Sequence, residues 1–357
     1  MKGFFKMRIG IIGAGNIAKI HAKTLSTIKE VELQGVYDIN KDKGKLLVEK
    51  FGGDFYEQLE NLLLDIEGVI IASPNYCHKD HILEAVHSNL HILCEKPMST
   101  SVEEAKEIMD VINKSNKRII MGFNYRYLYY VSKLKDLIDK KELGDIIRIT
   151  LHFKKDSALR KNSFTWKDDV NSRLTSGAFG DLGVHLVDLI WYLTNNEIDH
   201  ESIRVKMETN VTEKEKRRVF VDDHTEVYFS LENGAFANIV TSKVTSKERC
   251  GFFINILGSE KEVRYHSNED NNTLIIKNGM EEERIDLSPP LLTDPINEFH
   301  GWSDSFRNEL RDWLFPSSYP YMDTPTFEDG LRTQITLANV FQKAQASKRS
   351  LETITSR

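Results

Sequence analysis

The sequence has few cysteines, no excess of positive charge and no long apolar run, and each absence excludes a class of protein. Its 3 cysteines, Cys77, Cys94 and Cys250, lack the short paired spacing of a zinc site and the even number of a disulfide framework. The formal net charge of -6 argues against nucleic acid as a partner. No apolar run reaches the length of a membrane span, and charge interrupts the N-terminus too early for a signal peptide. We therefore expect a soluble, metal-free protein of the reducing cytoplasm.

Length and patterning indicate more than one domain. At 357 residues, with 29% charged and 40% hydrophobic residues, the chain has an ordinary globular composition and is too long for one compact core. In its first third, residues 9–12, 69–72 and 91–95 read as short strands, and residues 79–88 and 102–113 read as helices. This alternation predicts an α/β fold with a parallel, doubly wound sheet.

A glycine motif directly after the first predicted strand is the strongest local signal. Gly13, Gly15 and Ala18 have the G-x-G-x-x-G/A spacing, and a helical pattern follows them. Gly13 permits a tight turn, Gly15 lets a pyrophosphate approach the backbone, and Ala18 allows the helix to pack closely on the strand. The helix N-terminus then offers free N–H groups to the phosphates. A glycine-rich turn without a ligand is the alternative, but the order of strand, glycines and helix favours a dinucleotide.

An acidic residue at the end of the next predicted strand bears on the choice of dinucleotide. Asp38 ends the stretch "VELQGVYD", at the position where a carboxylate hydrogen-bonds the ribose hydroxyls of NAD. The same carboxylate repels the ribose phosphate of NADP, so we expect NAD as the cofactor. Asn40 and Lys41 lie nearby and leave NADP open.

Two further loops are expected to border the cofactor, because ligands of such sheets bind beyond the carboxyl ends of the strands. These are loops 73–78 and 94–98. Lys96 lies in the second loop, where Pro97 biases it toward an extended backbone at a strand end. An ordinary solvated surface lysine is the alternative for this residue.

A segment of the second half combines an apolar stripe with two polar side chains. Residues 179–193, "FGDLGVHLVDLIWYL", have helical periodicity, and Asp181 and His185 lie four positions apart on one face. The two side chains could reach one small molecule together. The alternative is a capping aspartate and a structural histidine.

Taken together, these motifs resemble the glucose-fructose oxidoreductase, inositol dehydrogenase and rhizopine catabolism (Gfo/Idh/MocA) family of NAD(P)-dependent sugar and polyol oxidoreductases. The resemblance is carried by residues 13–18, 73–75, 94–97, 122–127, 181–185 and 327–344. One departure is Ala178, where the family commonly has a glycine. The resemblance implies an NAD-binding Rossmann domain over residues 1–124 and a substrate-binding and oligomerisation α+β domain over residues 125–357.

The resemblance implies a large, open and mostly antiparallel sheet in the second domain, which in the family often carries the oligomer contact. Alternating residues at 145–153, 225–244 and 250–265 are compatible with such strands, with Asn-Gly or Gly-Ser turns between some of them. A helix is expected at 302–314, and its aromatic residues read as core rather than as a platform for a sugar. We expect a homodimer or homotetramer.

Oxidation of an alcohol requires a group that removes the hydroxyl proton as the hydride leaves. By resemblance to the family, Lys96 and His185 flank the reacting hydroxyl, and Asp181 hydrogen-bonds the substrate or orients the base. Which of Lys96 and His185 takes the proton stays open. The expected cofactor-binding residues are Gly13, Gly15, Asn16, Ile17, Asp38, Ser73, Asn75, His78, Glu95 and Lys96.

A local run of cations bears on the substrate. Residues 154–167 contain five lysine and arginine residues in an acidic protein, and such a cluster would attract a phosphorylated sugar. Arg160 and Lys154 are the best candidates for phosphate ligands. The expected substrate residues are Lys96, Arg126, Lys154, Arg160, Trp166, Asp181 and His185, with His224 as a further candidate. A solvated charged face is the alternative.

Residues 154–193 and 297–306 most resemble those family members that oxidise the C3 hydroxyl of glucose 6-phosphate with NAD. That reaction gives 3-oxo-glucose 6-phosphate and opens kanosamine-type aminosugar formation, which serves antibiotic biosynthesis. Two alternatives stay open. One is another dehydrogenase of the family that acts on a free hexose, an inositol or a nucleotide sugar. The other is a catalytically silent NAD-binding sugar sensor.

Overall fold

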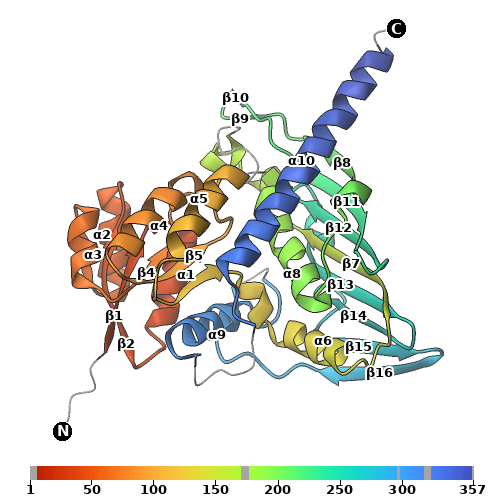
Figure 1. Ribbon diagram of the computed structural model, residues 1–357, viewed down its shortest axis with the longest axis horizontal. Helices are drawn as coiled ribbons and strands as arrows, with labels where there is room; N and C mark the ends of the chain where they lie inside the picture. Colours follow the sequence, from red (N-terminus) through yellow and green to blue (C-terminus); the bar gives the residue numbers. More distant parts are fainter. Residues whose placement is uncertain (1–5, 170–176, 296–297, 317–322, 356–357) are drawn as a thin grey trace. The chain divides into compact units, whose positions relative to one another are not determined.

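The computed structural model describes residues 6–169, 177–295, 298–316 and 323–355 (Figure 1). The chain forms two compact units. The first comprises Met1–Tyr127 and Ser303–Leu331, and the second comprises Leu128–Trp302 and Arg332–Arg357. Among the described residues, no helix is both long and apolar enough to cross a bilayer.

The first unit is built on a six-stranded parallel sheet of order β3-β2-β1-β4-β5-β6. This is the predicted doubly wound sheet. Its strands are β1 (Met7–Ile12), β2 (Val31–Tyr37), β3 (Asp54–Tyr56), β4 (Gly68–Ile71), β5 (His91–Glu95) and β6 (Ile119–Gly122). Its helices include α1 (Asn16–Leu25), α2 (Lys41–Phe51), α3 (Leu59–Asp65), α4 (His78–His87) and α5 (Val102–Ile112), with short 3-10 turns η1 (Asn75–Cys77) and η2 (Asn124–Tyr127).

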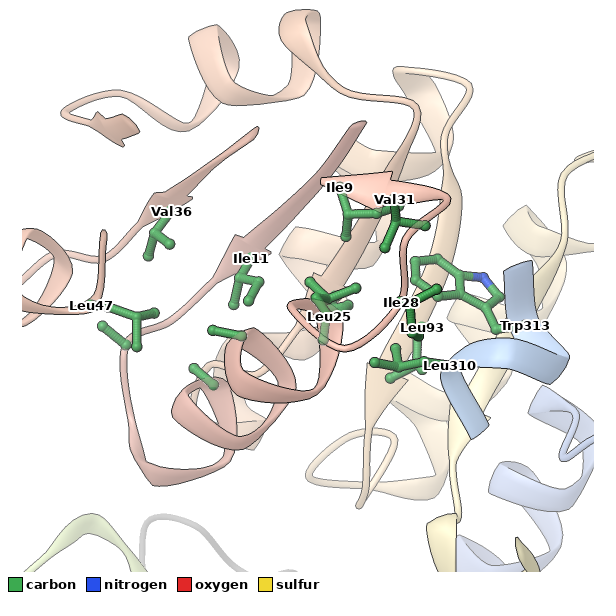
Figure 2. Packing of buried hydrophobic residues seen from close by; sticks show 14 of the residues in the cluster. Ile9, Ile11, Leu25, Ile28, Val31, Val36, Leu47, Leu93, Leu310 and Trp313 are labelled. Carbon is green, nitrogen blue, oxygen red and sulfur yellow. The ribbon is translucent and has the colours of Figure 1, made fainter. Parts of the chain in front are cut away.

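A late segment of the chain completes the core of the first unit. Helix α9 (Trp302–Leu314) places Leu310 and Trp313 among the side chains of β1, α1 and β5 (Figure 2). The Trp313 ring lies so close to Gly68 that a Cβ there would be 3.2 Å from it. The aromatic residues of this helix are therefore core, as predicted. By its contacts, Ser303–Leu331 groups with the first compact unit, whereas the linear division at residue 124 places these residues with the second domain.

The second unit is built on an eight-stranded sheet of order β16-β15-β14-β13-β7-β12-β11-β8. Every pair is antiparallel except β7 with β12, so the expectation of a mostly antiparallel sheet is confirmed. Its strands are β7 (Ile146–Lys154), β8 (Arg204–Glu208), β11 (His224–Ser230), β12 (Phe236–Ser242), β13 (Gly251–Gly258), β14 (Glu262–His266), β15 (Asp270–Asn278) and β16 (Glu281–Asp286). A separate hairpin pairs β9 (Glu213–Lys214) with β10 (Arg217–Arg218).

Helices cover one face of this sheet. The apolar positions of β7, Ile149, Leu151 and Phe153, are almost fully buried and alternate with more exposed residues. Helix α8 (Val184–Thr194) contacts β7 and β12 and also α6 (Tyr129–Asp139). The remaining helical elements of the unit are α7 (Ser157–Arg160), the 3-10 turns η3 (Trp166–Asp168), η6 (His200–Ser202) and η7 (Lys247–Arg249), the π-helical turn η5 (Phe179–Gly183), and α10 (Phe327–Thr355), which begins in the first unit.

Candidate functional site

The glycine loop after β1 has the geometry that a dinucleotide needs. Gly13 has φ +102°, and a Cβ there would lie 2.7 Å from the carbonyl oxygen of Ala72, so only glycine fits the turn. Gly15 is exposed, and a Cβ there would meet nothing within 4 Å. Asn16 and Ile17 open α1, and no side chain caps the first N–H groups of this helix. The backbone beside Gly15 is therefore open to a phosphate.

The carboxylate of Asp38 lies beside the same loop. Its Oδ2 accepts a hydrogen bond from the backbone N–H of Ala14 at 2.6 Å, and its Oδ1 accepts one from Asn40 at 2.7 Å. Each carboxylate oxygen has a second lone pair with which it can accept a ribose hydroxyl. The side chain thus organises the turn and remains able to bind a ribose. Together with the uncapped helix, it fits NAD.

The loop that follows β4 is closed onto the loop that follows β5 by a histidine. The Nδ1 and Nε2 atoms of His78 lie 2.8 Å from Pro97 O and 2.9 Å from Ser73 O. The ring is 1% exposed, and burial lowers the pKa of His78. Both ring nitrogens lie beside backbone carbonyls, so His78 connects the loop after β4 to the loop after β5. Ser73 Oγ lies 2.9 Å from Nδ1 of His81, and Asn75 is buried.

Lys96 follows β5 directly, and its neighbour Glu95 turns into the interior of the first unit. Lys96 is half-buried and precedes a cis peptide bond to Pro97. The Glu95 carboxylate contacts the ring of His21 on α1, with 2.7 Å between Oε1 and Nε2. This contact connects the strand end that carries Lys96 to the helix that follows the glycine loop.

Asp181 lies in the π-helical turn that precedes α8, a kind of irregularity that is frequent at functional sites. It does not cap the helix. The N–H of Phe179 donates instead to Oδ2 of Asp222 at 2.8 Å. Asp181 Oδ1 accepts from Lys167 Nζ at 2.8 Å, and its Oδ2 lies 3.1 Å from Lys243 Nζ. Asp181 is therefore the centre of a charged cluster rather than a cap.

His185 lies one helical turn after Asp181, near the start of α8. It is 5% exposed, on a helix whose neighbouring side chains are almost all apolar and buried. Asp181 and His185 both belong to the second unit and lie on successive turns of one helical segment, as their spacing predicted.

The cation cluster of residues 154–167 is largely compensated by carboxylates. Lys155 pairs with Glu298 at 3.0 Å, and Arg160 pairs with Asp156 at 3.3 Å. Lys167 forms the ion pair with Asp181 described above. Within the described chain, Lys154 and Lys161 form no ion pair. The local surplus of positive charge is thus smaller than the count of residues indicates, while Arg160 is well exposed.

Three other candidates have local partners or lie outside the description. Arg126 is 1% exposed, and its guanidinium is 3.2 Å from Asp329 Oδ2 and 3.3 Å from Asp323 O, so it stabilises the interior of the first unit. His224 Nε2 lies 3.1 Å from Glu226 Oε1 on the same strand. The backbone of Trp166 is described in η3, whereas its side chain lies outside the described part.

Sequence reasoning missed three residues around the candidates: Lys243, which contacts Asp181, His21, which contacts Glu95, and Asp222, which accepts from the N–H of Phe179 in the turn that carries Asp181. Lys243 comes just after β12, and a lysine after a strand is usually a solvated end. His21 lies in the first helix, where no spacing distinguishes it from a core histidine. Each of these residues reaches its partner only through tertiary structure, so no local pattern could have identified them.

Comparison with known proteins agrees with this arrangement. Residues 7–123 match a family model described as an oxidoreductase family with an NAD-binding Rossmann fold, and residues 135–353 match the C-terminal alpha/beta domain of the same family. The glucose-6-phosphate 3-dehydrogenase of Bacillus subtilis (strain 168) is 48% identical over 341 residues, 96% of this chain and 97% of that protein. The D-glucoside 3-dehydrogenase of Escherichia coli (strain K12) is 31% identical over 193 residues, 52% of this chain and 54% of that protein.

Among solved structures, levoglucosan dehydrogenase in complex with NADH and levoglucosan has a TM-score of 0.85. The match covers 96% of this chain and 98% of that chain at 22% identity, so it shows the fold. The family models together span most of the sequence. The chain therefore belongs to the Gfo/Idh/MocA oxidoreductase family, and its N-terminal domain is the NAD-binding Rossmann domain of that family.

Proposed function

We propose that the protein oxidises the C3 hydroxyl of glucose 6-phosphate to 3-oxo-glucose 6-phosphate with NAD. The observation that carries the proposal is the 48% identity to the Bacillus subtilis glucose-6-phosphate 3-dehydrogenase over 96% of this chain. The match spans both domains of the chain, including the segments that carry Lys96, Asp181 and His185.

When bound, NAD supplies the hydride acceptor of this reaction. The protein must then remove the hydroxyl proton, and we assign that step to Lys96 or His185. A lysine would become a base if its charged form were disfavoured, whereas a histidine titrates near neutral pH without help. Asp181 would accept a hydrogen bond from the substrate or orient the base. Its two oxygens are contacted by two ammonium groups, Lys167 Nζ and Lys243 Nζ, which restrain the orientation of the carboxylate.

The phosphate of the substrate is assigned to Arg160 and Lys154. Arg160 is exposed, and among the described residues its ion pair is with Asp156, four residues earlier, so a phosphate could replace or join that carboxylate. Lys154 ends β7 and forms no ion pair within the described chain. Arg126, Trp166 and His224 stay weaker candidates for substrate contact.

The ion pairs within the cation cluster of residues 154–167 favour a second candidate substrate. Because three of the five cations at 154–167 already have carboxylate partners, an unphosphorylated sugar or inositol is a reasonable substrate for the same machinery. Initial rates of NAD reduction with glucose 6-phosphate, glucose and myo-inositol separate the two. A kcat/KM for glucose 6-phosphate well above the others supports the proposal. Equal rates on all three, or preference for an unphosphorylated substrate, would reject it.

The proposed function includes an oligomeric state and a cytoplasmic location. The sheet of the second unit carries exposed apolar side chains, Ile147, Tyr228 and Phe236, which would suit a face between copies in a homodimer or homotetramer. The three cysteines are free, as in a reducing cytoplasm. A 3-oxo product is a suitable substrate for amine transfer, which fits a first step of kanosamine-type aminosugar formation in antibiotic biosynthesis.

A further inference from the structure

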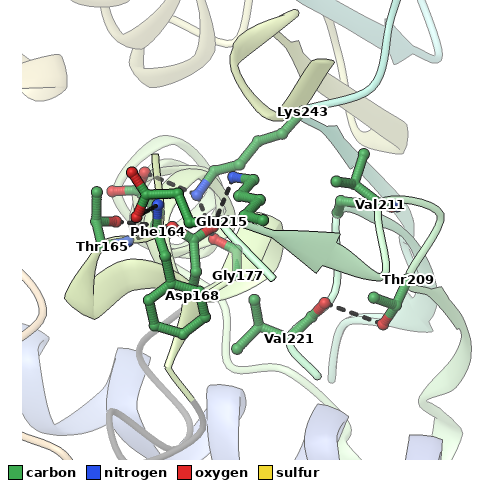
Figure 3. Close-up of polar contacts among 12 residues, drawn as sticks. Phe164, Thr165, Asp168, Gly177, Thr209, Val211, Glu215, Val221 and Lys243 are labelled. Atoms are coloured by element: carbon green, nitrogen blue, oxygen red, sulfur yellow. Dashed lines mark hydrogen bonds and ion pairs between the residues drawn. The ribbon is translucent and has the colours of Figure 1, made fainter. Parts of the chain in front are cut away.

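Lys243 is a lysine that the proposed reaction does not yet use, although it lies against a residue that the reaction needs. It follows β12, and only 12% of its side chain is exposed. Its Nζ donates a hydrogen bond to Gly177 O at 2.7 Å (Figure 3). The same Nζ lies 3.1 Å from Asp181 Oδ2. A lysine covered to this extent needs a compensating partner, and here the partner is Asp181.

The two oxygens of Asp181 are held by two different lysines. Lys167 contacts Oδ1 at 2.8 Å and Lys243 contacts Oδ2 at 3.1 Å. Lys167 is 42% exposed, whereas Lys243 is 12% exposed. An exposed lysine is flexible and screened by solvent, so the covered one restrains the carboxylate more strongly. Rotation of the carboxylate would break at least one of the two contacts.

The anchor of Lys243 is itself fixed. Gly177 has φ +77°, and a Cβ there would lie 2.0 Å from Asp222 Oδ1, so the turn is closed onto this aspartate. Asp222 Oδ2 accepts hydrogen bonds from the N–H of Phe179 at 2.8 Å and from Thr225 Oγ1 at 2.7 Å. The carbonyl of Gly177 therefore has a defined position, and through it so does the ammonium group of Lys243.

We propose that Lys243 is a positioning residue of the dehydrogenase reaction, whose ammonium group holds the Asp181 carboxylate in one orientation. The proposal rests on the role proposed above for Asp181. It does not depend on which sugar is oxidised, because it concerns a contact within the second unit. Its consequence is that part of the activity follows the protonation of Lys243, which acts through Asp181.

The charges around Lys243 determine how this dependence should look. The groups that face it are Asp181 on η5, Lys167 on η3 and Asp222 before β11. Burial lowers the pKa of Lys243, although Asp181 opposes the shift. As the pH rises through that lowered pKa, Lys243 loses its charge and Asp181 loses its covered partner. An arginine at this position would keep its charge over the whole range.

The test compares the wild type with Lys243→Met, Lys243→Arg and the control Lys135→Met. Lys135 is 17% exposed and pairs with Asp139 on α6, so it is a similarly covered lysine of the same unit. We expect Lys243→Met to lower kcat by up to about 100-fold, the scale of a misplaced catalytic group, with unchanged binding of NADH. Lys243→Arg should recover part of kcat and move the alkaline fall of kcat to higher pH. Lys135→Met should leave kcat and its pH profile unchanged.

Two results would overturn the proposal. One is a Lys243→Met variant that folds and keeps the kcat and pH profile of the wild type. The other is a Lys243→Arg variant whose alkaline fall is unmoved. Folding is checked by urea unfolding of Lys243→Met, Asp181→Asn and the double variant, where a direct contact gives non-additive losses of stability.

The assays also separate this proposal from the proposed function. The kinetics are run with whichever sugar of the panel the wild type oxidises, so a failure with glucose 6-phosphate alone rejects the substrate and not the role of Lys243. If the wild type oxidises none of them, the non-additivity of the two substitutions decides alone. Additive losses would then reject the contact between Lys243 and Asp181.

Discussion

His21 and Glu95 form a buried pair that joins the helix after the glycine loop to the strand end before Lys96. Their Nε2 and Oε1 atoms are 2.7 Å apart, and the two residues are 0% and 7% exposed. Phe306 of α9 packs edge-on against the His21 ring, with 5.3 Å between the ring centroids. Three segments distant in the sequence are thus held together at one point of the first unit.

Replacing His21 by Phe should destabilise the protein by about 3 kcal/mol, because it leaves the carboxylate of Glu95 buried without its partner. His21→Gln keeps a donor and should lose less. Urea unfolding at pH 7 measures both. Equal stability of His21→Phe and the wild type would show that Glu95 does not depend on this contact.

The buried carboxyl group of Glu309 should make the free energy of unfolding depend on pH. It is 0% exposed, and neither carboxyl oxygen has a hydrogen-bond partner in the described residues. Burial, followed by the charges of Glu95 and Asp312, raises its pKa well above the usual value of 4.5. Above pH 4.5 the unfolded chain releases a proton that the folded chain retains, so the folded state loses stability as the pH rises.

Glu309→Gln should therefore be more stable than the wild type at pH 8 and equally stable near pH 4. The gain is about 1.4 kcal/mol for each pH unit between 4.5 and the raised pKa. Thermal or urea unfolding across this range measures it. Glu328→Gln, an exposed glutamate on α10, is the matched control and should show no such gain. A difference between Glu309→Gln and the wild type that is the same at every pH would contradict the buried, protonated state.

The carboxylate of Asp38 should determine the preference for NAD over NADP. Asp38→Ala removes the acceptor expected for the ribose, and a hydrogen bond to a charged group is worth about 1.5–3 kcal/mol. We expect KM for NAD to rise by about 10- to 100-fold. KM for NADP should change less, because the repulsion of the ribose phosphate is lost at the same time. Asp38→Asn keeps an oxygen acceptor for Ala14 N and separates loop geometry from charge. An unchanged ratio of the two KM values would exclude Asp38 as the discriminating residue.

Lys96→Ala tests the proposed acid-base chemistry. If Lys96 takes or shares the hydroxyl proton, kcat should fall by about 10²–10⁴-fold. NADH affinity is followed separately by fluorescence titration, because Lys96 is also expected to border the cofactor, and the loss of kcat should exceed any loss of affinity. Lys79→Met removes a surface lysine of α4 that pairs with Glu107 and serves as the control. Turnover of Lys96→Ala at the wild-type rate would remove the lysine from the mechanism and leave His185.

Local motifs gave a reliable prediction of the first unit because its determinants are close in sequence. Gly13 and Gly15 follow β1 directly, and Asp38 follows β2 directly, so the strand ends could be located from short windows. Helix α9 behaves differently. Its periodicity predicted the helix, but nothing in residues 302–314 indicates that Leu310 and Trp313 pack against β1 and α1. Domain membership is a property of tertiary contacts, which sequence periodicity does not encode.

The same limit explains the charged residues. Lys155 and Lys167 looked like parts of a positive surface, since residues 154–167 contain one acidic residue, Asp156. Glu298 reaches Lys155 from 143 positions away, and Asp181 reaches Lys167 from 14 positions away. Counting charges in a window therefore overestimates local potential wherever folding supplies the opposite charges from elsewhere.

The assignment of the phosphate to Arg160 predicts a substrate-dependent defect. Arg160→Ala should raise KM for glucose 6-phosphate by about 10-fold or more, because a charge-assisted hydrogen bond is lost, and should leave KM for glucose unchanged. Asp156→Asn frees Arg160 from its present partner and should lower KM for glucose 6-phosphate. Both effects should weaken at high ionic strength, since Arg160 is exposed. Lys206→Ala removes an exposed cation of β8 and controls for a general loss of positive charge. If Arg160→Ala and Lys206→Ala raise KM equally, the phosphate is attracted by the overall field of the protein, and Arg160 is not its ligand.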